Sequence, residues 1–226
     1  SAAKGIKADG DMRITDGTVN VTTSGSGAFD TDDNDAKGCA GLKTDGNMSI
    51  SGGSITLRST GSGGKCIKAD GCLTISNGSI SATSTGSEYS YSRNYTASAK
   101  AIKSDGAMAI SGGTITASSS SHEAIESKST LDVTGGVVSA TASDDAINSA
   151  SHMTISGGYV MGISTGNDGI DANGNMYIKG GIVYASCSGS PEVALDANTE
   201  GGYKLYVSGG TIVAIGGLES GASLEQ

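Results

Sequence analysis

The feature that most constrains this chain is a phrase that recurs along it. Lys100 to Ala117 reads KAIKSDGAMAISGGTITA, and the leading apolar residue of that phrase, Ile102, has an equivalent in each of eight copies. Behind each leader, apolar or small residues fall two positions apart, interrupted by a two-residue turn that is usually Gly-Gly. This alternation is typical of short strands with one buried face. The leaders are Ile6, Leu42, Ile67, Ile102, Ile125, Ile147, Ile170 and Leu195.

One such unit cannot bury its apolar face alone, so the copies must stack on one another. We therefore expect an all-β fold, a right-handed parallel β-helix (solenoid) of about eight coils with three short strands in each. The 37 glycines, single proline and absent tryptophan suit a narrow core with tight corners. Residues 1–217 are expected to form one domain with long loops at 22–38 and 84–99, and residues 218–226 a tail without the pattern.

Bulk properties narrow the classes of partner. The net charge of −9 argues against nucleic acid and anionic membrane surfaces. No apolar run is long enough to span a bilayer, so membrane insertion is not expected. A Ser/Thr/Gly-rich and Lys-poor composition fits a secreted or cell-surface protein, although no signal segment is visible in this chain.

The first long loop is acidic. Oxygen ligands at alternating positions suit calcium, but a solvated acidic loop without an ion is an equal alternative. The residues concerned are Asp30, Asp32, Asp33 and Asp35.

The second long loop is the most aromatic segment of an aromatic-poor chain, with Tyr89, Tyr91, Arg93 and Tyr95. Loops carried on a rigid scaffold often bind ligands, and tyrosine rings can stack on sugar rings. The alternative is a lid that packs on the flank of the protein itself.

Outward positions of the first strand form charged columns. One residue after the leaders, the copies read Lys7, Lys43, Lys68, Lys103, Glu126, Asn148, Asp171 and Asp196. Two residues before the leaders they read Lys4, Ala40, Lys65, Lys100, Glu123, Asp145, Asp168 and Val193. Three residues after the leaders, the first four copies carry Asp9, Asp45, Asp70 and Asp105, which can neutralise the lysines of their own copy and the next. We name these the first column, the second column and the aspartate column.

The cationic half of the columns indicates a binding surface. Lys68, Lys100 and Lys103 fall in copies next to the tyrosine-bearing loop, and this flank is the expected docking site for an acidic or plant cell-wall polysaccharide.

The acidic half of the columns indicates a metal site. Asp171 should stack on Asp196 about 4.8 Å away, and Asp145 on Asp168. Such pairs repel by roughly 1 kcal/mol in water and by about 3–4 kcal/mol at an effective dielectric near 20. With carboxylate, amide and backbone oxygens as the donors, the expected ion is hard, calcium before magnesium. A solvated acidic face without an ion is the alternative.

Three segments, each followed by the phrase M-x-I-x-G-G-x-V or a close variant, resemble a known family: HEAIES from His122, DDAIN from Asp144 and NDGID from Asn167. The chain resembles the calcium-binding, carbohydrate-binding β-helix proteins of bacteria that look like family 9 polysaccharide lyases. This resemblance implies a secreted or surface-attached protein that binds plant-type or acidic polysaccharide and holds calcium on its acidic repeats. The residues that would hold calcium are Glu123, Glu126, Asp144, Asp145, Asn148, Asn167, Asp168, Asp171 and Asp196.

Catalysis stays open at the level of sequence. Polysaccharide lyases of this kind use a lysine or arginine base with calcium on the neighbouring carboxyl group, and Lys103 is the best candidate base. Each lysine of the first column has a carboxylate two residues on, however, which favours the protonated state. We therefore expect a non-catalytic binding protein first, a lyase second and a structural adhesin rod third.

Overall fold

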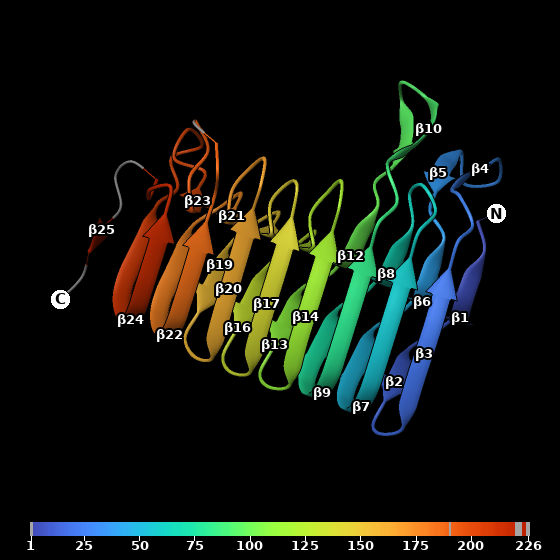
Figure 1. Ribbon diagram of the computed structural model, residues 1–226, viewed down its shortest axis with the longest axis horizontal. Coiled ribbons are helices and arrows are strands. Elements are labelled where there is room, and N and C mark those ends of the chain that lie inside the picture. The colour runs from blue at the N-terminus through green and yellow to red at the C-terminus, as the bar shows by residue number, and fades with distance from the viewer. Residues whose placement is uncertain (1, 190, 220–222, 225–226) are drawn as a thin grey trace.

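The computed structural model describes residues 2–189, 191–219 and 223–224, and in this part every regular element is a strand. The strands of successive repeats lie side by side along one axis, from the N-terminal repeat to the C-terminal one (Figure 1). Within the described residues, no helix is long and apolar enough to cross a membrane.

The first strand of each repeat belongs to an eight-stranded sheet in which every pair is parallel. Each leader is paired with the leader of the next repeat, as in Ile102 with Ile125 and Ile170 with Leu195. The strands, in sheet order, are β1 (Lys4–Ala8), β6 (Ala40–Thr44), β8 (Lys65–Ala69), β12 (Lys100–Ser104), β15 (Ile125–Ser127), β18 (Ile147–Ser149), β21 (Ile170–Ala172) and β23 (Leu195–Ala197).

The remaining strands of the repeats form a thirteen-stranded sheet, also parallel. In four repeats the second and third strands are one continuous strand: β7 (Met48–Ser59), β9 (Leu73–Ser84), β22 (Met176–Ser186) and β24 (Leu205–Ile215). In the other repeats they are separate: β2 (Met12–Ile14), β3 (Thr18–Thr23), β13 (Met108–Ile110), β14 (Thr114–Ser119), β16 (Leu131–Val133), β17 (Val137–Ala142), β19 (Met153–Ile155) and β20 (Tyr159–Ser164). The last member is β25 (Ser223–Leu224).

This arrangement corrects the expected fold, a right-handed parallel β-helix with three short, separate strands in each of about eight coils. The described strands build an all-β molecule on an eight-stranded parallel sheet, with a single thirteen-stranded parallel sheet for the rest of each repeat. The strands on the two sides of the Gly-Gly turn belong to the same sheet. Gly53 and Gly181, with φ of 89° and 83°, lie inside the continuous strands β7 and β22.

The core lies between the two sheets and consists of the predicted apolar columns. Leaders such as Leu42, Ile67 and Ile102 are buried, together with Met108 and Ile110 of β13. Ile6 is 44% exposed, because β1 has a neighbouring strand on one side only. The alternation of two therefore predicts which face of each strand is buried.

Both long loops fold into antiparallel hairpins at the N-terminal half of the molecule (Figure 1). The first is β4 (Ala28–Asp30) with β5 (Asp35–Lys37), and the second is β10 (Tyr89–Ser92) with β11 (Tyr95–Ala97). Of the expected tail, residues 220–222 and 225–226 lie outside the described part, while Leu218 bridges to Leu195.

Candidate functional site

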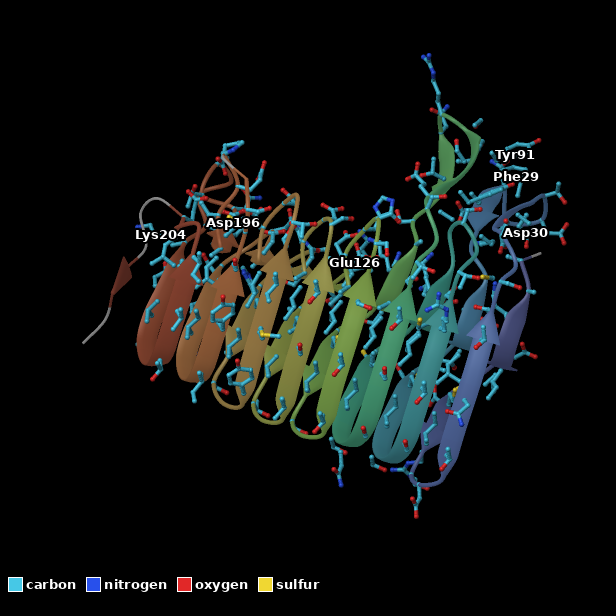
Figure 2. All side chains as sticks on the ribbon, in the orientation of Figure 1. Phe29, Asp30, Tyr91, Glu126, Asp196 and Lys204 are labelled. Carbon is cyan, nitrogen blue, oxygen red and sulfur yellow. The ribbon has the colours of Figure 1, made fainter. Side chains whose placement is uncertain are left out.

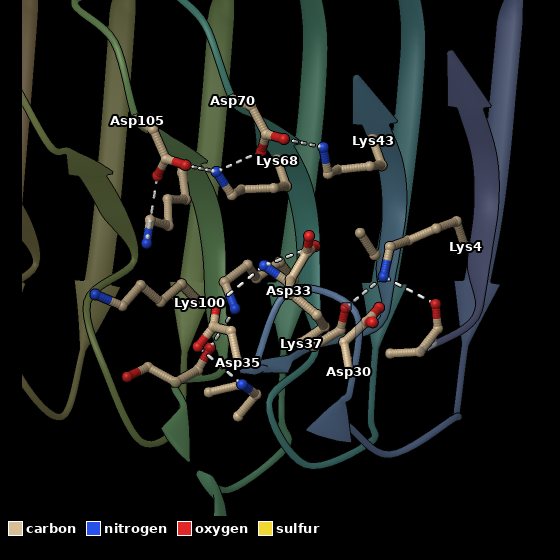
Figure 3. A pocket seen from close by; sticks show the side chains of 18 of the residues that line it. Lys4, Asp30, Asp33, Asp35, Lys37, Lys43, Lys68, Asp70, Lys100 and Asp105 are labelled. Atoms are coloured by element: carbon tan, nitrogen blue, oxygen red, sulfur yellow. Dashed lines mark hydrogen bonds and ion pairs between the residues drawn. The ribbon is translucent and has the colours of Figure 1, made fainter. Parts of the chain in front are cut away.

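Lysines and aspartates of the first four repeats form a ladder of shared ion pairs (Figure 3). The Nζ atom of Lys43 lies 2.5 Å from a carboxylate oxygen of Asp45 and 2.6 Å from one of Asp70. Lys68 likewise pairs with Asp70, at 2.8 Å, and with Asp105. Lys43 and Lys68 thus each bridge the aspartate of their own repeat and that of the next, as the column pattern predicts.

The lysines of the second column are more deeply buried and have different partners. Lys100 pairs with Glu123 at 2.8 Å and with Glu126 at 2.7 Å. Lys65, which is 8% exposed, donates hydrogen bonds to the carbonyl oxygens of Gly63 and Ser98. Burial, followed by the charges of Lys103, Lys100 and Lys68, lowers the pKa of Lys65 to about 7.

A cleft of about 610 Å³ lies between the ladder and the β4–β5 hairpin. Among the described residues, nine lysines and six aspartates line it, so cationic side chains outnumber anionic ones. The predicted ligand-binding residues Lys68, Lys100 and Lys103 all belong to this lining. We call this site the cationic cleft.

The predicted aromatic ligand residues lie outside the lining of the cationic cleft. Tyr91 stacks on Phe29 with ring centroids 4.2 Å apart (Figure 2). Tyr95 meets Phe29 edge-on, with ring centroids 5.0 Å apart. The Tyr95 hydroxyl also accepts a hydrogen bond from Asn34, and a side chain at Gly27 would collide with the Tyr89 ring. These rings therefore hold the two hairpins together, while Arg93 is exposed in the turn.

The acidic loop is tied to a lysine. Lys37 pairs with Asp35 at 3.0 Å and with Asp33 at 3.4 Å. Asp30 accepts a hydrogen bond from the backbone N–H of Asp32. Asp30, Asp33 and Asp35 also line the cationic cleft, so this loop forms a wall of that site.

A second hollow, of about 410 Å³, lies over the last repeats, and we call it the acidic hollow. Carboxylate oxygens of Asp168, Asp171 and Asp196 lie within 4.8 Å of one another, and Asp171 pairs in register with Asp196 as predicted. The lining residues among those described are all acids and amides: Asp145, Asn148, Asn167, Asp168, Asp171, Asn173, Glu192, Asp196, Asn198 and Glu200.

The carboxyl groups of the acidic hollow are held in an unfavourable environment. Burial, followed by the charges of Asp145, Asp196 and Asp168, raises the pKa of Asp171 well above its ordinary value. Burial also raises the pKa of Asp145 to about 7. Asn148 and Asn173 donate hydrogen bonds to Asp171, but amides bring no positive charge. An oxygen-only donor set with uncompensated carboxylates fits a hard divalent cation such as calcium.

Three of the nine residues predicted to hold calcium lie outside the lining of the acidic hollow. Glu126 is fully buried and pairs with Lys100 and, at 2.6 Å, with Lys128, while Glu123 pairs with Lys100. Asp144 lies 3.7 Å from a ring nitrogen of His122. The column pattern shows that Glu123 and Glu126 follow Lys100 and Lys103, but it does not show that a lysine side chain reaches them.

Lys103, the candidate base, is held less closely than the other lysines of its column. Its Nζ atom lies 3.5 Å from Asp105 and 3.8 Å from Glu126, and burial lowers its pKa. Sequence reasoning did not propose Lys4 or Lys65 as ligand residues, although both stand in the second column. The sequence could have indicated these two lysines, because the neighbouring residues of the second column, Ala40 and Lys100, carry no carboxylate.

Comparison with known proteins adds one finding. A family model described as a carbohydrate-binding domain-containing protein matches residues 1–146. The matched span contains every residue that lines the cationic cleft. The search of curated proteins and the search of solved structures each found no match.

Proposed function

This chain belongs to the family of carbohydrate-binding domain-containing proteins, and we propose that its ligand is an acidic polysaccharide of plant cell-wall type. Binding takes place without catalysis, in the cationic cleft, in a protein that is secreted or attached to the cell surface. The family supports a carbohydrate-binding role, and the class of polysaccharide, the calcium dependence and the location are the proposed steps.

The observation that carries this proposal is the excess of lysine in the cationic cleft. Lysines recur in register in adjacent repeats, as in Lys68 with Lys103 and Lys65 with Lys100. Neighbouring strands are about 4.8 Å apart, so the cleft offers a row of positive charges to a chain of anionic sugars. A neutral polymer would bring no counter-charge to Lys4 and Lys65, which donate only to carbonyl oxygens of the described residues.

Calcium is the second component of the proposal. Asp168, Asp171 and Asp196 would hold the ion, because their oxygens converge and their mutual repulsion needs a positive charge. When bound, calcium supplies that charge and stabilises the C-terminal repeats. Glu126 has no such role in this proposal, since lysines already neutralise it.

A retention experiment tests the proposed function. The protein is passed over immobilised polygalacturonate, cellulose and a neutral dextran, with calcium and with a chelator. We expect retention on polygalacturonate that falls with added salt, because exposed charges are screened, and that weakens without calcium. Equal behaviour on polygalacturonate and on neutral dextran would contradict an acidic ligand.

A polysaccharide lyase is a second candidate, and the setting of Lys103 favours it. A general base must be able to lose its proton, and both the long ion pairs of Lys103 and the lowering of its pKa by burial favour that loss. Incubation with polygalacturonate and calcium would then produce the ultraviolet absorbance of an unsaturated sugar. A flat absorbance trace, together with retention of the intact polymer, supports the binding protein instead.

A further inference from the structure

Two lysines of the cationic cleft differ from the rest in their partners. Within the described part of the chain, Lys4 and Lys65 are the cleft lysines that form no ion pair with a carboxylate. The Nζ atom of Lys4 donates to the carbonyl oxygens of Gly38, at 2.6 Å, and Ala2, at 2.9 Å. Lys65 donates to Ser98 at 2.8 Å and to Gly63 at 3.2 Å. Both ammonium groups therefore have hydrogen-bond acceptors but no counter-charge.

The two groups converge on one residue. Gly38 accepts the hydrogen bond of Lys4, and a Cβ atom at Gly38 would lie 3.1 Å from the Nζ atom of Lys65. Ala40 lies between the two lysines in the second column, paired in register with Lys4 on one side and Lys65 on the other. Because positions 38 and 40 carry no long side chain, the wall between the two ammonium groups is open to the cleft, which both residues line.

Among the described aspartates that line the cleft, all but Asp30 already pair with another lysine. Asp45, Asp70 and Asp105 each pair with two ladder lysines already, and Lys37 engages Asp33 and Asp35. The charged groups around Lys65 are otherwise mainly cationic: Lys68 on β8, Lys100 and Lys103 on β12, Lys43 on β6 and Lys4 on β1, with Glu126 on β15 and Asp30 on the hairpin as the anionic exceptions. Burying an ammonium among like charges is unfavourable, so a ligand that brings a negative charge would be bound strongly here.

We propose that Lys4 and Lys65, with Gly38 and Ala40 between them, form a socket for an oxyanion carried on a sugar ring. The ligand group is a uronic acid carboxylate or a sulfate ester, and the two lysines donate charge-assisted hydrogen bonds to it. This inference rests on the proposed function and adds the point at which the acidic group of the polysaccharide is recognised. The ladder lysines supply the surrounding positive field, and their own charges stay paired with aspartates.

The test compares two single-charge variants. Lys65→Met removes the socket charge and puts an apolar side chain of similar length at a buried position. Lys204→Met removes an equal charge from an exposed residue far from the cleft (Figure 2). Titration calorimetry in a calcium buffer near pH 7, with polygalacturonate, dextran sulfate and neutral dextran as probes, measures both affinity and protons exchanged.

We expect Lys65→Met to weaken binding of a charged probe roughly tenfold or more, and Lys204→Met to change it less than about twofold. Wild-type binding should take up protons, because a bound anion raises the pKa of an amine that titrates near 7. That proton uptake should vanish in Lys65→Met. The probe that shows both effects identifies the group as carboxylate or sulfate.

The other possible results separate the socket from the proposed function. Equal affinities of the two variants, or wild-type binding without proton uptake, overturn the socket while the proposed function stands. No binding of either charged polymer by the wild type overturns the proposed function and the socket together. Should Lys65→Met fail to fold by circular dichroism, Lys4→Met and the wild-type proton uptake decide the question.

Discussion

The positive charge of a buried lysine in the second column is neutralised only where the next repeat places a carboxylate beside it. Lys100 lies against Glu123 and Glu126, whereas Lys65, two strands from β1 in the same sheet, has only carbonyl oxygens within hydrogen-bonding distance among the described groups. The two residues pair in register, so their difference comes from the repeat that follows each of them. Stability should therefore rise with pH in two separate ranges, an alkaline one through Lys65 and an acid one through Glu126, the partner of Lys100.

Lys65→Met should raise the free energy of unfolding at pH 7 by about 1–4 kcal/mol, because an apolar side chain replaces a buried ammonium. The pKa of Lys65 is about 7 in the folded protein and 10.5 in the unfolded chain, so the unfolded state binds more protons between those values. The free energy of unfolding of the wild type should accordingly increase through Lys65 as the pH rises from 7 to 10.5. The variant should lack this pH-dependent increase. Urea unfolding at pH 7 and pH 9.5 measures both. A variant that is less stable than wild type at pH 7 would contradict the burial argument.

Glu126→Gln should destabilise the protein by about 3–5 kcal/mol at pH 7, because it leaves Lys100 buried without its main counter-charge. Burial alone would raise the pKa of Glu126, but the charges of Lys100 and Lys103 outweigh burial and lower it to about 2. Its stabilising contribution is therefore present above pH 4.5 and is lost as the pH falls toward 2. Thermal melting between pH 2 and pH 5 should show a flatter acid limb in the variant. Asp132→Asn, an exposed carboxylate on β16, is the control and should change stability by less than about 0.5 kcal/mol.

At the scale of elements, a glycine with positive φ lies at the bend between the second and third strand segments, both where the strand is continuous, as at Gly53, and where it is divided, as at Gly17. Gly53 lies inside β7 with φ of 89°, and a Cβ atom there would lie 2.9 Å from the carbonyl oxygen of Gly17. Gly17 has the same kind of backbone, with φ of 94°, but no atom within 4 Å of the corresponding position in the described structure. Backbone strain and collision between layers can therefore be separated.

Gly17→Ala should cost about 1–2 kcal/mol, the strain of an L-residue with positive φ. Gly53→Ala should cost more, because its methyl group also meets backbone of the preceding layer. Gly10→Ala, with ordinary φ and open space, should stay within about 0.5 kcal/mol of wild type. Chemical unfolding of the three variants gives the ranking. If Gly53→Ala lowered the free energy of unfolding no more than Gly17→Ala does, the close approach of Gly53 to the backbone of the preceding repeat would not limit the size of the side chain.

At the scale of the whole molecule, charge is divided along the axis of stacking. The cationic cleft lies at the N-terminal half beside the two hairpins, and the acidic hollow lies over the last repeats, with Glu126 between them (Figure 2). The net charge of −9 hides this division. An acidic polysaccharide should therefore approach the N-terminal half directly, whereas the C-terminal half needs a cation before it can tolerate more negative charge.

Chelation should lower the melting temperature of the wild type, because a ligand that binds only the folded state stabilises it by mass action. A calcium concentration about 100 times Kd corresponds to roughly 2.7 kcal/mol, which is on the order of 5–10 °C for a chain of this size. Asp168→Ala should remove most of this calcium dependence. The control is Asp16→Ala, an exposed residue in a turn of the first repeat, which should keep it. Identical melting curves with calcium and with chelator would show that the acidic hollow holds no stabilising ion.

The sequence by itself determined which residues share a column and which face of each strand is buried. In a parallel sheet the repeat period sets the register, so Asp171 opposite Asp196 and the shared lysine–aspartate ladder could both be predicted and are confirmed. The carbohydrate-binding part of the family resemblance is confirmed as well. Calcium and the acidic polysaccharide stay predictions.

Tertiary structure decided the features that the period does not control. Whether the strands on the two sides of a Gly-Gly turn belong to one sheet depends on their pairing with neighbouring repeats, which is why the expected coils of three separate strands were wrong. The period also does not show which of several nearby carboxylates a lysine side chain pairs with. Lys100 pairs with Glu123 and Glu126, two residues that were expected to hold metal. The two hairpins lie outside the repeat pattern, so the period does not predict their contacts. Tyr91 and Tyr95 of the second hairpin pack on Phe29 of the first. The β4–β5 hairpin also forms a wall of the cationic cleft. The spacing of residues in the sequence determines which residues lie opposite one another in adjacent repeats. Side-chain contacts between distant residues determine which of those residues are left to bind a ligand or a metal ion.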